Sequence, residues 1–291
     1  MMNGVPEMSS RLIDGVEIKY LVYGEEGPDV VLAHATGFNP YMFHPISKAL
    51  SKKYRVIVPC LCSHRDPGET NSEIGWETLA GDLYSLLKSL GVEQPFLVGH
   101  SMGAVIVTLI HCLFKLPARK MVLIEPIFLP HETYGMILSV TEHPMASKAI
   151  KRKNGWQNID ACRAYFLSKP FFQSWDKEML ELYLSYGLMP EEDGGVSLAC
   201  PPEKEAGLFL GSTQRNPWPL LKEAACPVLL LEGEISENRI FLDLKETTKA
   251  FRQGSYREIT GAGHLIPMEK PAETLEVIET FFQADGLSDT L

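Results

Sequence analysis

The segment that most constrains the fold of this 291-residue chain is the pentapeptide Gly99-His100-Ser101-Met102-Gly103. It stands between a short apolar run, Phe96-Leu97-Val98, and an apolar stretch of helical length at 104–114. A sharp strand-to-helix turn lifts a serine out of a sheet and presents its hydroxyl to a base. Such a turn crowds the residues two before and two after the serine, so glycine at 99 and 103 answers a steric demand. The pattern therefore predicts a nucleophile elbow with Ser101 at its tip.

A histidine that can serve this serine follows near the C-terminus, in Gly261-Ala262-Gly263-His264. A strand-like run at 256–259 precedes it, and Pro271 is expected to open a helix after it. A histidine on a glycine-flanked loop at a strand end is free to reach across to Ser101, and the other histidines lack this placement. We therefore predict that neutral His264 is the base and that activity falls below about pH 6–7.

A third segment, His34-Ala35-Thr36-Gly37-Phe38, follows the buried-strand pattern at 30–33 and precedes a helix that is expected to begin near Tyr41. This is where an oxyanion-binding loop belongs. We expect the backbone N–H groups of Thr36 and Met102 to bind the developing oxyanion.

On these segments, with Val122-Leu123-Ile124-Glu125-Pro126 and Pro227-Val228-Leu229-Leu230-Leu231, the chain resembles the α/β-hydrolase superfamily over nearly all of its length. The resemblance implies a doubly wound, mostly parallel sheet with an inserted helical lid, Ser101 as nucleophile and His264 as base. Independently, alternation of strand-like and helical segments argues for an α/β fold with a mostly parallel sheet. The strand-like runs are 18–23, 30–33, 55–59, 96–98, 121–124, 228–231 and 256–259.

Two glutamates compete for the role of the acid that orients His264. Relatives commonly carry an aspartate three positions after the glycine that ends the strand at 228–231, and Ser236 occupies that position here. Glu237 follows one residue later, and its longer side chain makes up some of the displacement. The other site known in the superfamily is the end of the strand after the nucleophile helix, where this chain has Glu125. Because both strand ends lie at the carboxyl edge of the sheet, either carboxylate can orient the Nδ1 side of His264. Glu125 is preferred, with Glu237 as the alternative.

The segment at 56–67 departs from the superfamily pattern. Relatives commonly carry Asp-x-Arg-Gly-x-Gly here, and Cys60 and Cys62 take the charged positions in this chain. We expect a loop that is built differently. Cys60, Cys62 and His64 also raise the hypothesis of a metal site, but no second ligand cluster at zinc-site spacing accompanies them, so no metal is expected.

The division expected from the sequence is a hydrolase core at 1–126 and 217–291 and a helical lid at 127–216. Aromatic and methionine side chains of the lid are expected either to line an apolar substrate pocket or to form the lid's own small core. The residues that we place at the pocket are His34, Phe38, Phe128 and Trp175.

The composition and charge of the chain argue against some classes of binding partner. A formal net charge of −10 argues against nucleic acid and anionic membranes, which select for basic patches. No stretch approaches the roughly 18 apolar residues of a membrane span. The six cysteines show no framework spacing, and the first residues lack the basic start and apolar core of a signal peptide, so a cytoplasmic location is expected.

These observations predict a serine hydrolase, carboxylesterase-like, that needs no cofactor. Its small-molecule substrate is expected to be an ester or a related carbonyl compound of small to medium size and largely apolar character, cleaved through an acyl-enzyme intermediate. Alternatives on the same fold are a carbon–carbon bond hydrolase, a haloperoxidase-like enzyme and a ligand receptor with slow turnover.

Overall fold

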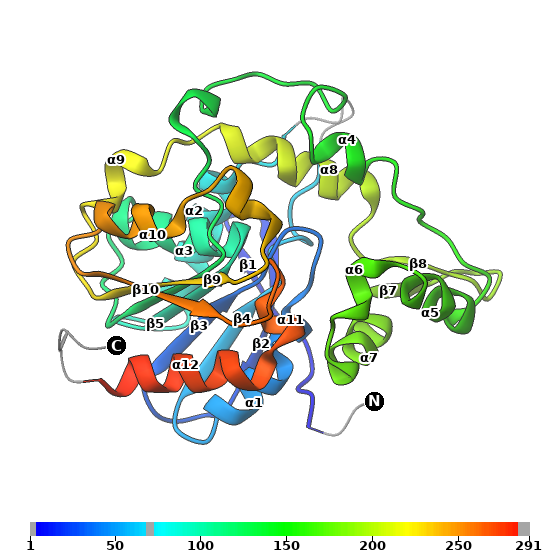
Figure 1. The fold of residues 1–291 in the computed structure, drawn as a ribbon. Coiled ribbons are helices and arrows are strands. Elements are labelled where there is room, and N and C mark those ends of the chain that lie inside the picture. Colours follow the sequence, from blue (N-terminus) through cyan, green and yellow to red (C-terminus); the bar gives the residue numbers. More distant parts are fainter. Residues whose placement is uncertain (1–3, 68–72, 285–291) are drawn as a thin grey trace.

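The central element of the fold is a twisted, mostly parallel sheet (Figure 1). The computed structural model describes residues 4–67 and 73–284, and within them the sheet has eight strands in the order β1-β2-β4-β3-β5-β6-β9-β10. Neighbours from β4 to β10 in that order pair in parallel, whereas β2 is antiparallel to both β1 and β4. The expected fold class is thus confirmed. The strands are β1 (Ser9–Ile13), β2 (Val16–Tyr23), β3 (Asp29–Ala33), β4 (Arg55–Pro59), β5 (Phe96–His100), β6 (Met121–Ile124), β9 (Val228–Gly233) and β10 (Gly254–Ile259).

Helices cover both faces of this sheet (Figure 1). One face carries α1 (His44–Leu50) and α12 (Pro271–Gln283), and the other carries α2 (Trp76–Ser89), α3 (Met102–Cys112) and α10 (Leu244–Thr247). The short helix α11 (Ile266–Glu269) precedes α12.

Strand β3 shows how the apolar runs build two cores. Val30 and Leu32 belong to the core under α1 and α12, whereas Val31 and Ala33 belong to the core under α2 and α3. Successive side chains of a strand point to opposite faces, so a strand that is covered on both sides is apolar throughout. This packing places the carboxyl ends of the parallel strands at a common edge, where the candidate site forms.

A long segment separates β6 from β9 and falls into two parts (Figure 1). The first is formed by α4 (Ala146–Ala149) and α8 (Pro202–Leu210), which pack on each other through a small apolar cluster. The second is a side module of three helices and a hairpin. The helices are α5 (Ile159–Leu167), α6 (Pro170–Gln173) and α7 (Lys177–Tyr186), and the hairpin is formed by β7 (Leu188–Pro190) and β8 (Val196–Leu198). After α8, the short helix α9 (Trp218–Leu221) leads to β9.

Aromatic stacking attaches the side module to the loop after β3. The ring of Tyr186 stacks on Tyr41 at 3.9 Å between centroids, and the ring of Trp175 lies 5.8 Å from that of Phe38. The backbone N–H of Asp176 also donates to the carbonyl of Met268 at 2.9 Å. The module is therefore anchored beside the carboxyl edge of the sheet.

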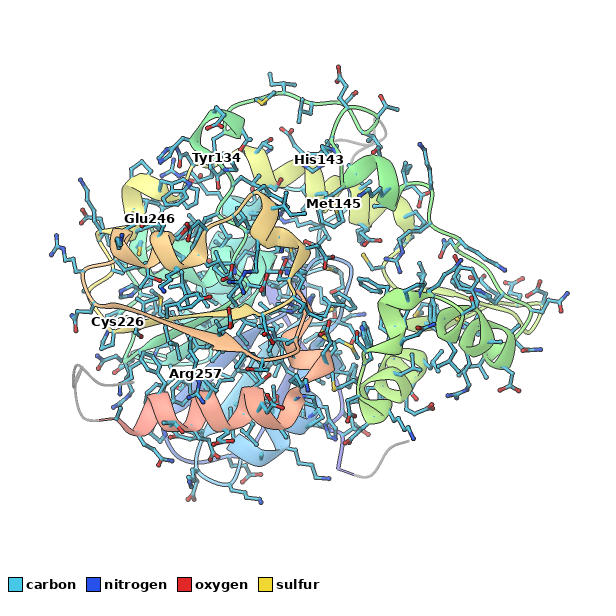
Figure 2. All side chains as sticks on the ribbon, viewed as in Figure 1. Tyr134, His143, Met145, Cys226, Glu246 and Arg257 are labelled. Carbon is cyan, nitrogen blue, oxygen red and sulfur yellow. The ribbon has the colours of Figure 1, made fainter. Side chains whose placement is uncertain are left out.

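The connection that leads from β6 to α4 is held by a buried histidine. Figure 2 shows His143 close to Met145 at the start of α4. Nδ1 of His143 accepts from the backbone N–H groups of Met145 and Ala146 at 3.2 Å each, and Nε2 lies 3.3 Å from the Ser212 hydroxyl. These bonds satisfy amides at a helix start, where no intrahelical acceptor exists.

Two hairpins were not foreseen from the sequence. β1 pairs with β2 through a two-residue turn at Asp14 and Gly15, both with positive φ, which is the turn geometry that Asp-Gly favours. β7 and β8 pair within residues 127–216, where the sequence analysis expected helices. Three-residue strands are too short for a periodic signal.

No helix in the described ranges combines the length and the apolarity needed to cross a bilayer.

Candidate active site

The turn between β5 and α3 has the geometry of the predicted elbow. Ser101 has φ 56° and ψ −118°, a conformation that costs a non-glycine residue about 1–3 kcal/mol and persists only where the surrounding structure imposes it. A β-carbon on Gly99 would lie 2.4 Å from Cα of Ala104, and one on Gly103 would lie 2.1 Å from the carbonyl oxygen of Ala33. The steric demand inferred for both glycines is therefore confirmed.

Ser101, His264 and Glu125 form a continuous row of polar contacts. Nε2 of His264 lies 3.1 Å from Oγ of Ser101, and Nδ1 lies 3.1 Å from Oε2 of Glu125. The residues come from three loops at the carboxyl edge: the ends of β5 and β6 and the loop after β10. Glu237, the alternative acid, is exposed at the first turn of a 3-10 helix (Glu237–Ile240), so the geometry favours Glu125.

Glu125 is deeply buried and well supplied with donors. Its side chain is 1 % exposed, and its φ of 47° turns the chain sharply at the end of β6. Oε1 accepts from the backbone N–H of Gly233 at 2.7 Å, and Oε2 accepts from the Ser236 hydroxyl at 2.8 Å. Ser236 stands where relatives commonly carry the acid. In this chain the position holds a hydroxyl that donates to the carboxylate of Glu125, at the end of β6.

Asn238 is a site residue that the sequence reasoning missed. Its Nδ2 lies 2.8 Å from Nδ1 of His264 and 3.3 Å from Oε2 of Glu125. An amide nitrogen only donates and a carboxylate only accepts. The contact of Nδ1 with Asn238 therefore needs the tautomer of His264 that is protonated at Nε2, whereas the contact with Glu125 needs the tautomer that is protonated at Nδ1. The sequence signal is weak, because Asn238 lies in a polar loop in which Glu237 is the more evident candidate.

His100 is a second missed residue. It is fully buried, and its Nε2–H donates to the carbonyl oxygen of His264 at 2.9 Å. Burial, with the nearby His264, lowers the pKa of His100 to about 3. This neutral ring therefore links the residue before Ser101 to the loop that presents His264.

The two backbone amides that the sequence assigned to an oxyanion-binding site are those of Thr36 and Met102. Met102 is the first residue of α3, where an N–H has no acceptor within the helix. No hydrogen bond from the amide of Thr36 is seen among the described residues. Thr36 lies just after β3, which pairs directly with β5. Both amides are thus available in the region where the sequence placed the oxyanion.

The expected pocket residues fall into two groups. Phe38 and Trp175 pack on each other and both approach Tyr183, at 5.8 and 5.7 Å between ring centroids. His34 and Phe128 are at most 1 % exposed. His34 donates from Nδ1 to its neighbour's carbonyl and accepts the N–H of Leu61 at Nε2, each at 2.9 Å.

Phe128 packs near Trp218 and Phe251 in the sheet core. The structure thus gives His34 and Phe128 packing roles, and their part in a substrate pocket stays a prediction.

The cysteine-containing loop after β4 is built around an ion pair. His64 contacts Asp82 through Nε2 at 3.1 Å, and Arg65 donates two hydrogen bonds to the same carboxylate. Burial opposes ionisation of Asp82, but the bonds from Arg65 and His64 outweigh it and lower the pKa to about 2. Cys60 and Cys62 are free thiols, and no cluster of three or more potential ligands in the described ranges is arranged to hold a metal ion.

Comparison with known proteins agrees with this arrangement. The sequence matches the alpha/beta hydrolase family over residues 30–277. The chain belongs to that family. This α/β-hydrolase is 24% identical over 276 residues to an uncharacterized carboxylesterase, nap, of Bacillus subtilis strain 168, covering 91% of this chain and 82% of that protein. It is also 24% identical over 264 residues to the 2-(acetamidomethylene)succinate hydrolase of Mesorhizobium japonicum, with 89% of each chain covered.

A shorter match relates this chain to the magnesium-chelatase 30 kDa subunit of Rhodobacter capsulatus, 35% identical over 82 residues. That match spans 28% of this chain and only 29% of the relative. Among solved structures, E-2-(acetamidomethylene)succinate hydrolase superposes with a TM-score of 0.76 at 20% identity, covering 96% of this chain and 100% of the other. The enol-lactonase of Burkholderia xenovorans gives 0.72 at 18%, covering 95% and 100%. Family membership and these hydrolase relatives support a hydrolase activity.

Proposed function

We propose that this α/β-hydrolase is a serine hydrolase that cleaves an ester or a related carbonyl substrate through an acyl-enzyme. The single observation that carries the proposal is the row of contacts Ser101–His264–Glu125, with 3.1 Å at each of its two steps. A serine within hydrogen-bond reach of a histidine that is oriented by a carboxylate is the arrangement that activates a hydroxyl.

In the proposed reaction, Oγ of Ser101 attacks the substrate carbonyl carbon while its proton passes to Nε2 of His264. The resulting oxyanion is bound by the amides of Thr36 and Met102, and one such donor contributes about 3–4 kcal/mol in comparable sites. Collapse of the intermediate breaks the bond to the leaving alcohol, which takes the proton from His264. Water then attacks the acyl-serine and gives its proton to His264, which returns it to Ser101 as the acid leaves.

We further propose that residues 127–216 act as a lid on the hydrolase core. The contacts between Phe38 and Trp175 and between Tyr41 and Tyr186 bring this segment against the loop that carries the oxyanion amide. Their aromatic character supports a substrate of small to medium size and largely apolar surface. A carboxylesterase among the relatives that align over most of the chain is consistent with an ester substrate.

The test is hydrolysis of p-nitrophenyl esters from acetate to decanoate by the full chain and by three variants. Ser101→Ala removes the nucleophile, and we expect kcat/KM to fall by a factor of about 10⁴ or more. Glu125→Gln removes the carboxylate that faces Nδ1, and we expect a loss of about a hundredfold or more. Glu237→Gln is the matched control, because this glutamate is exposed and we expect its variant to keep activity.

The outcomes separate the alternatives. Ester turnover that survives in Ser101→Ala would rule out the proposed nucleophile. A large loss in Glu237→Gln with little change in Glu125→Gln would transfer the acid role to Glu237. No turnover of any ester above the Ser101→Ala background would reject the esterase reaction and favour a non-ester substrate or a receptor.

A further inference from the structure

A cavity in the side module carries cations and aromatic rings and lies outside the row formed by Ser101, His264 and Glu125. Its volume is about 300 Å³, at the lower limit of small-ligand pockets. Its walls come from the segment before α5, from α5 itself and from α6. The lining residues that matter here are Arg152, Lys153, Lys169, Tyr165, Phe171 and Phe172, and none of the described residues that line the cavity is acidic.

Two ammonium groups converge on one ring at this cavity. Nζ of Lys169 lies 4.6 Å from the centroid of Tyr165, and Nζ of Lys153 lies 5.3 Å from the same ring. Among the described residues, no carboxylate pairs with either lysine. Like charges that share one ring repel each other, and an anion between them would relieve this repulsion.

The third cation is already partnered. Nη1 of Arg152 pairs with Glu205, and Nη2 donates to the Tyr183 hydroxyl at 3.3 Å. Arg152 therefore contributes a fixed wall, and the positive charge that a ligand meets comes from Lys153 and Lys169.

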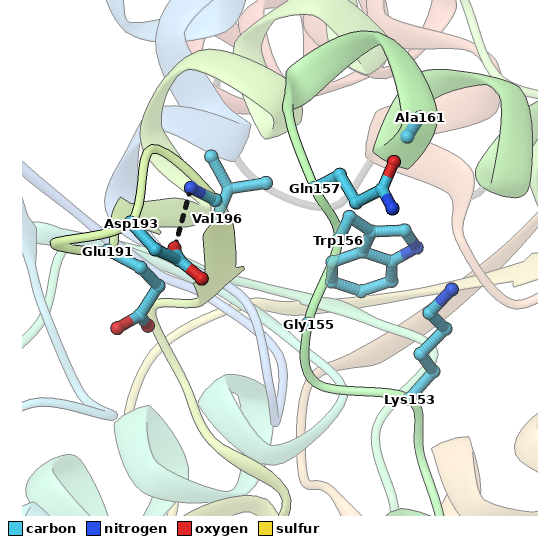
Figure 3. A pocket seen from close by; sticks show the side chains of 9 residues that line it. Lys153, Gly155, Trp156, Gln157, Ala161, Glu191, Asp193 and Val196 are labelled. Carbon is cyan, nitrogen blue, oxygen red and sulfur yellow. Dashed lines mark hydrogen bonds between the residues drawn. The ribbon is translucent and has the colours of Figure 1, made fainter.

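The remaining walls suit an apolar body. The rings of Phe171 and Phe172 meet edge to face at 5.0 Å between centroids, and Phe171 is 50% exposed. An aromatic or short aliphatic group can lie against this pair while a charged head reaches the lysines. A neighbouring cavity of about 540 Å³ shares Lys153 but is also lined by Glu191 and Asp193, so it lacks this uniform sign of charge (Figure 3).

We propose that this cavity is a binding site for a small organic anion, with an apolar or aromatic body against Phe171 and Phe172 and its charged head at Lys153 and Lys169. Charge-assisted hydrogen bonds to two lysines provide the selectivity for an anion over its neutral analogue. The site is separate from the reaction proposed for Ser101 and does not depend on turnover.

The experiment measures binding of 3-phenylpropionate and of phenyl phosphate by isothermal titration calorimetry, with the full-length Ser101→Ala protein. The neutral control ligand is 3-phenylpropanamide, which has the same shape without the charge. The cavity variant is Lys153→Met/Lys169→Met, in which methionine keeps most of the apolar stem. The control variant, Lys177→Met/Lys222→Met, makes the same change in net charge at exposed lysines that do not line the cavity.

We expect at least one of the two anions to bind, and the amide to bind about tenfold more weakly or not at all. The cavity variant should lose about tenfold or more in affinity for the anion. The control variant should keep its affinity. Binding should also weaken as salt is raised, because the lysines are exposed. The two anions tell a carboxylate preference from a phosphate preference.

Three results would overturn the proposal: equal affinity of the cavity and control variants, equal binding of the amide, or no binding of either anion. A fourth is loss of binding when Ser101 of the unmutated protein is phosphonylated, since the anion would then occupy the proposed reaction site. Circular dichroism and the thermal midpoint show whether the cavity variant is folded. The proposed esterase can fail its own test while this site passes, and the reverse also holds.

Discussion

At the scale of single residues, the candidate site contains two residues with strained backbone conformations, and two side chains contact the same nitrogen of His264. Ser101 and Glu125 both have positive φ, and each ends a parallel strand at the carboxyl edge. Between them, Nδ1 of His264 faces the acceptor Oε2 of Glu125 and the donor Nδ2 of Asn238. Only the tautomer that is protonated at Nδ1 leaves Nε2 free to take the proton of Ser101. In the reaction proposed for Ser101, Asn238 would therefore lower the fraction of molecules in which Nε2 of His264 can accept the proton.

Replacing Asn238 by alanine removes the donor that stabilises the unproductive tautomer. We expect the Nδ1-protonated form of His264 to gain population, and kcat for p-nitrophenyl acetate to rise by up to about twofold if the two tautomers are equally populated at rest. Nitrogen-15 NMR of the histidine ring, which distinguishes the two tautomers, checks the cause. An unchanged tautomer ratio with a loss of kcat that parallels a loss of stability would assign Asn238 a merely structural role.

At the scale of elements, one ion pair links the segment after α4 to α8 and to the loop after β3. Glu205 of α8 pairs with Arg152, and a β-carbon on Gly37 would lie only 2.6 Å from Oε1 of Glu205. Burial raises the pKa of Glu205, an effect that Arg152 opposes without cancelling. The pair thus joins two parts of the long insertion at the loop that bears Thr36.

Glu205→Gln leaves Arg152 without its carboxylate. We expect a loss of about 2 kcal/mol in the free energy of unfolding, below the range for fully buried pairs because the Arg152 side chain is 30% exposed. Urea denaturation measures it, with Glu203→Gln on the same helix turn as the exposed control. Arg152→Met/Glu205→Gln should lose less than Glu205→Gln alone, because no unpaired cation remains; a larger loss would contradict the pair's proposed role.

At the scale of the whole molecule, buried neutral histidines make stability depend on pH. Burial lowers the pKa of His34 to about 4 and that of His100 to about 3. Both lie below the value of about 6.5 in an unfolded chain, so the unfolded state takes up protons first as the pH falls. The stabilisation is complete above about pH 6.5 and is lost progressively below it. Burial also lowers the pKa of His44, His111 and His143, in the same direction.

We expect the free energy of unfolding to fall by about 4 kcal/mol between pH 7 and pH 5, about 2 kcal/mol for each of His34 and His100. Urea titrations at half-unit steps of pH measure this slope. His34→Gln should lower the free energy of unfolding at every pH. It should also reduce the fall between pH 7 and pH 5 by the contribution of His34, about 2 kcal/mol. The Asp82 ion pair has its own window below about pH 4, because the pKa of Asp82 is lowered to about 2. A flat profile from pH 7 to 5 would contradict the expectation.

Local sequence determined most strands of the main sheet and the turn that carries Ser101. The alternation of apolar runs and helical segments predicted the strands from β2 to β10 of the main sheet, and the glycines at 99 and 103 predicted the elbow, because burial periodicity and steric crowding act over a few residues. The order of Ser101, an acid and His264 along the chain followed from the same motifs.

Only the tertiary structure decided which side chains meet. Glu125 and Glu237 were both reasonable acids from the sequence, and the register of β6 against β9 brings Glu125 to Gly233 and Ser236. The contacts of Asn238 and His100 with His264, and the approach of Lys153 and Lys169 to one ring, join residues on different segments. Such contacts depend on packing between distant parts of the chain, which no pattern within one segment encodes.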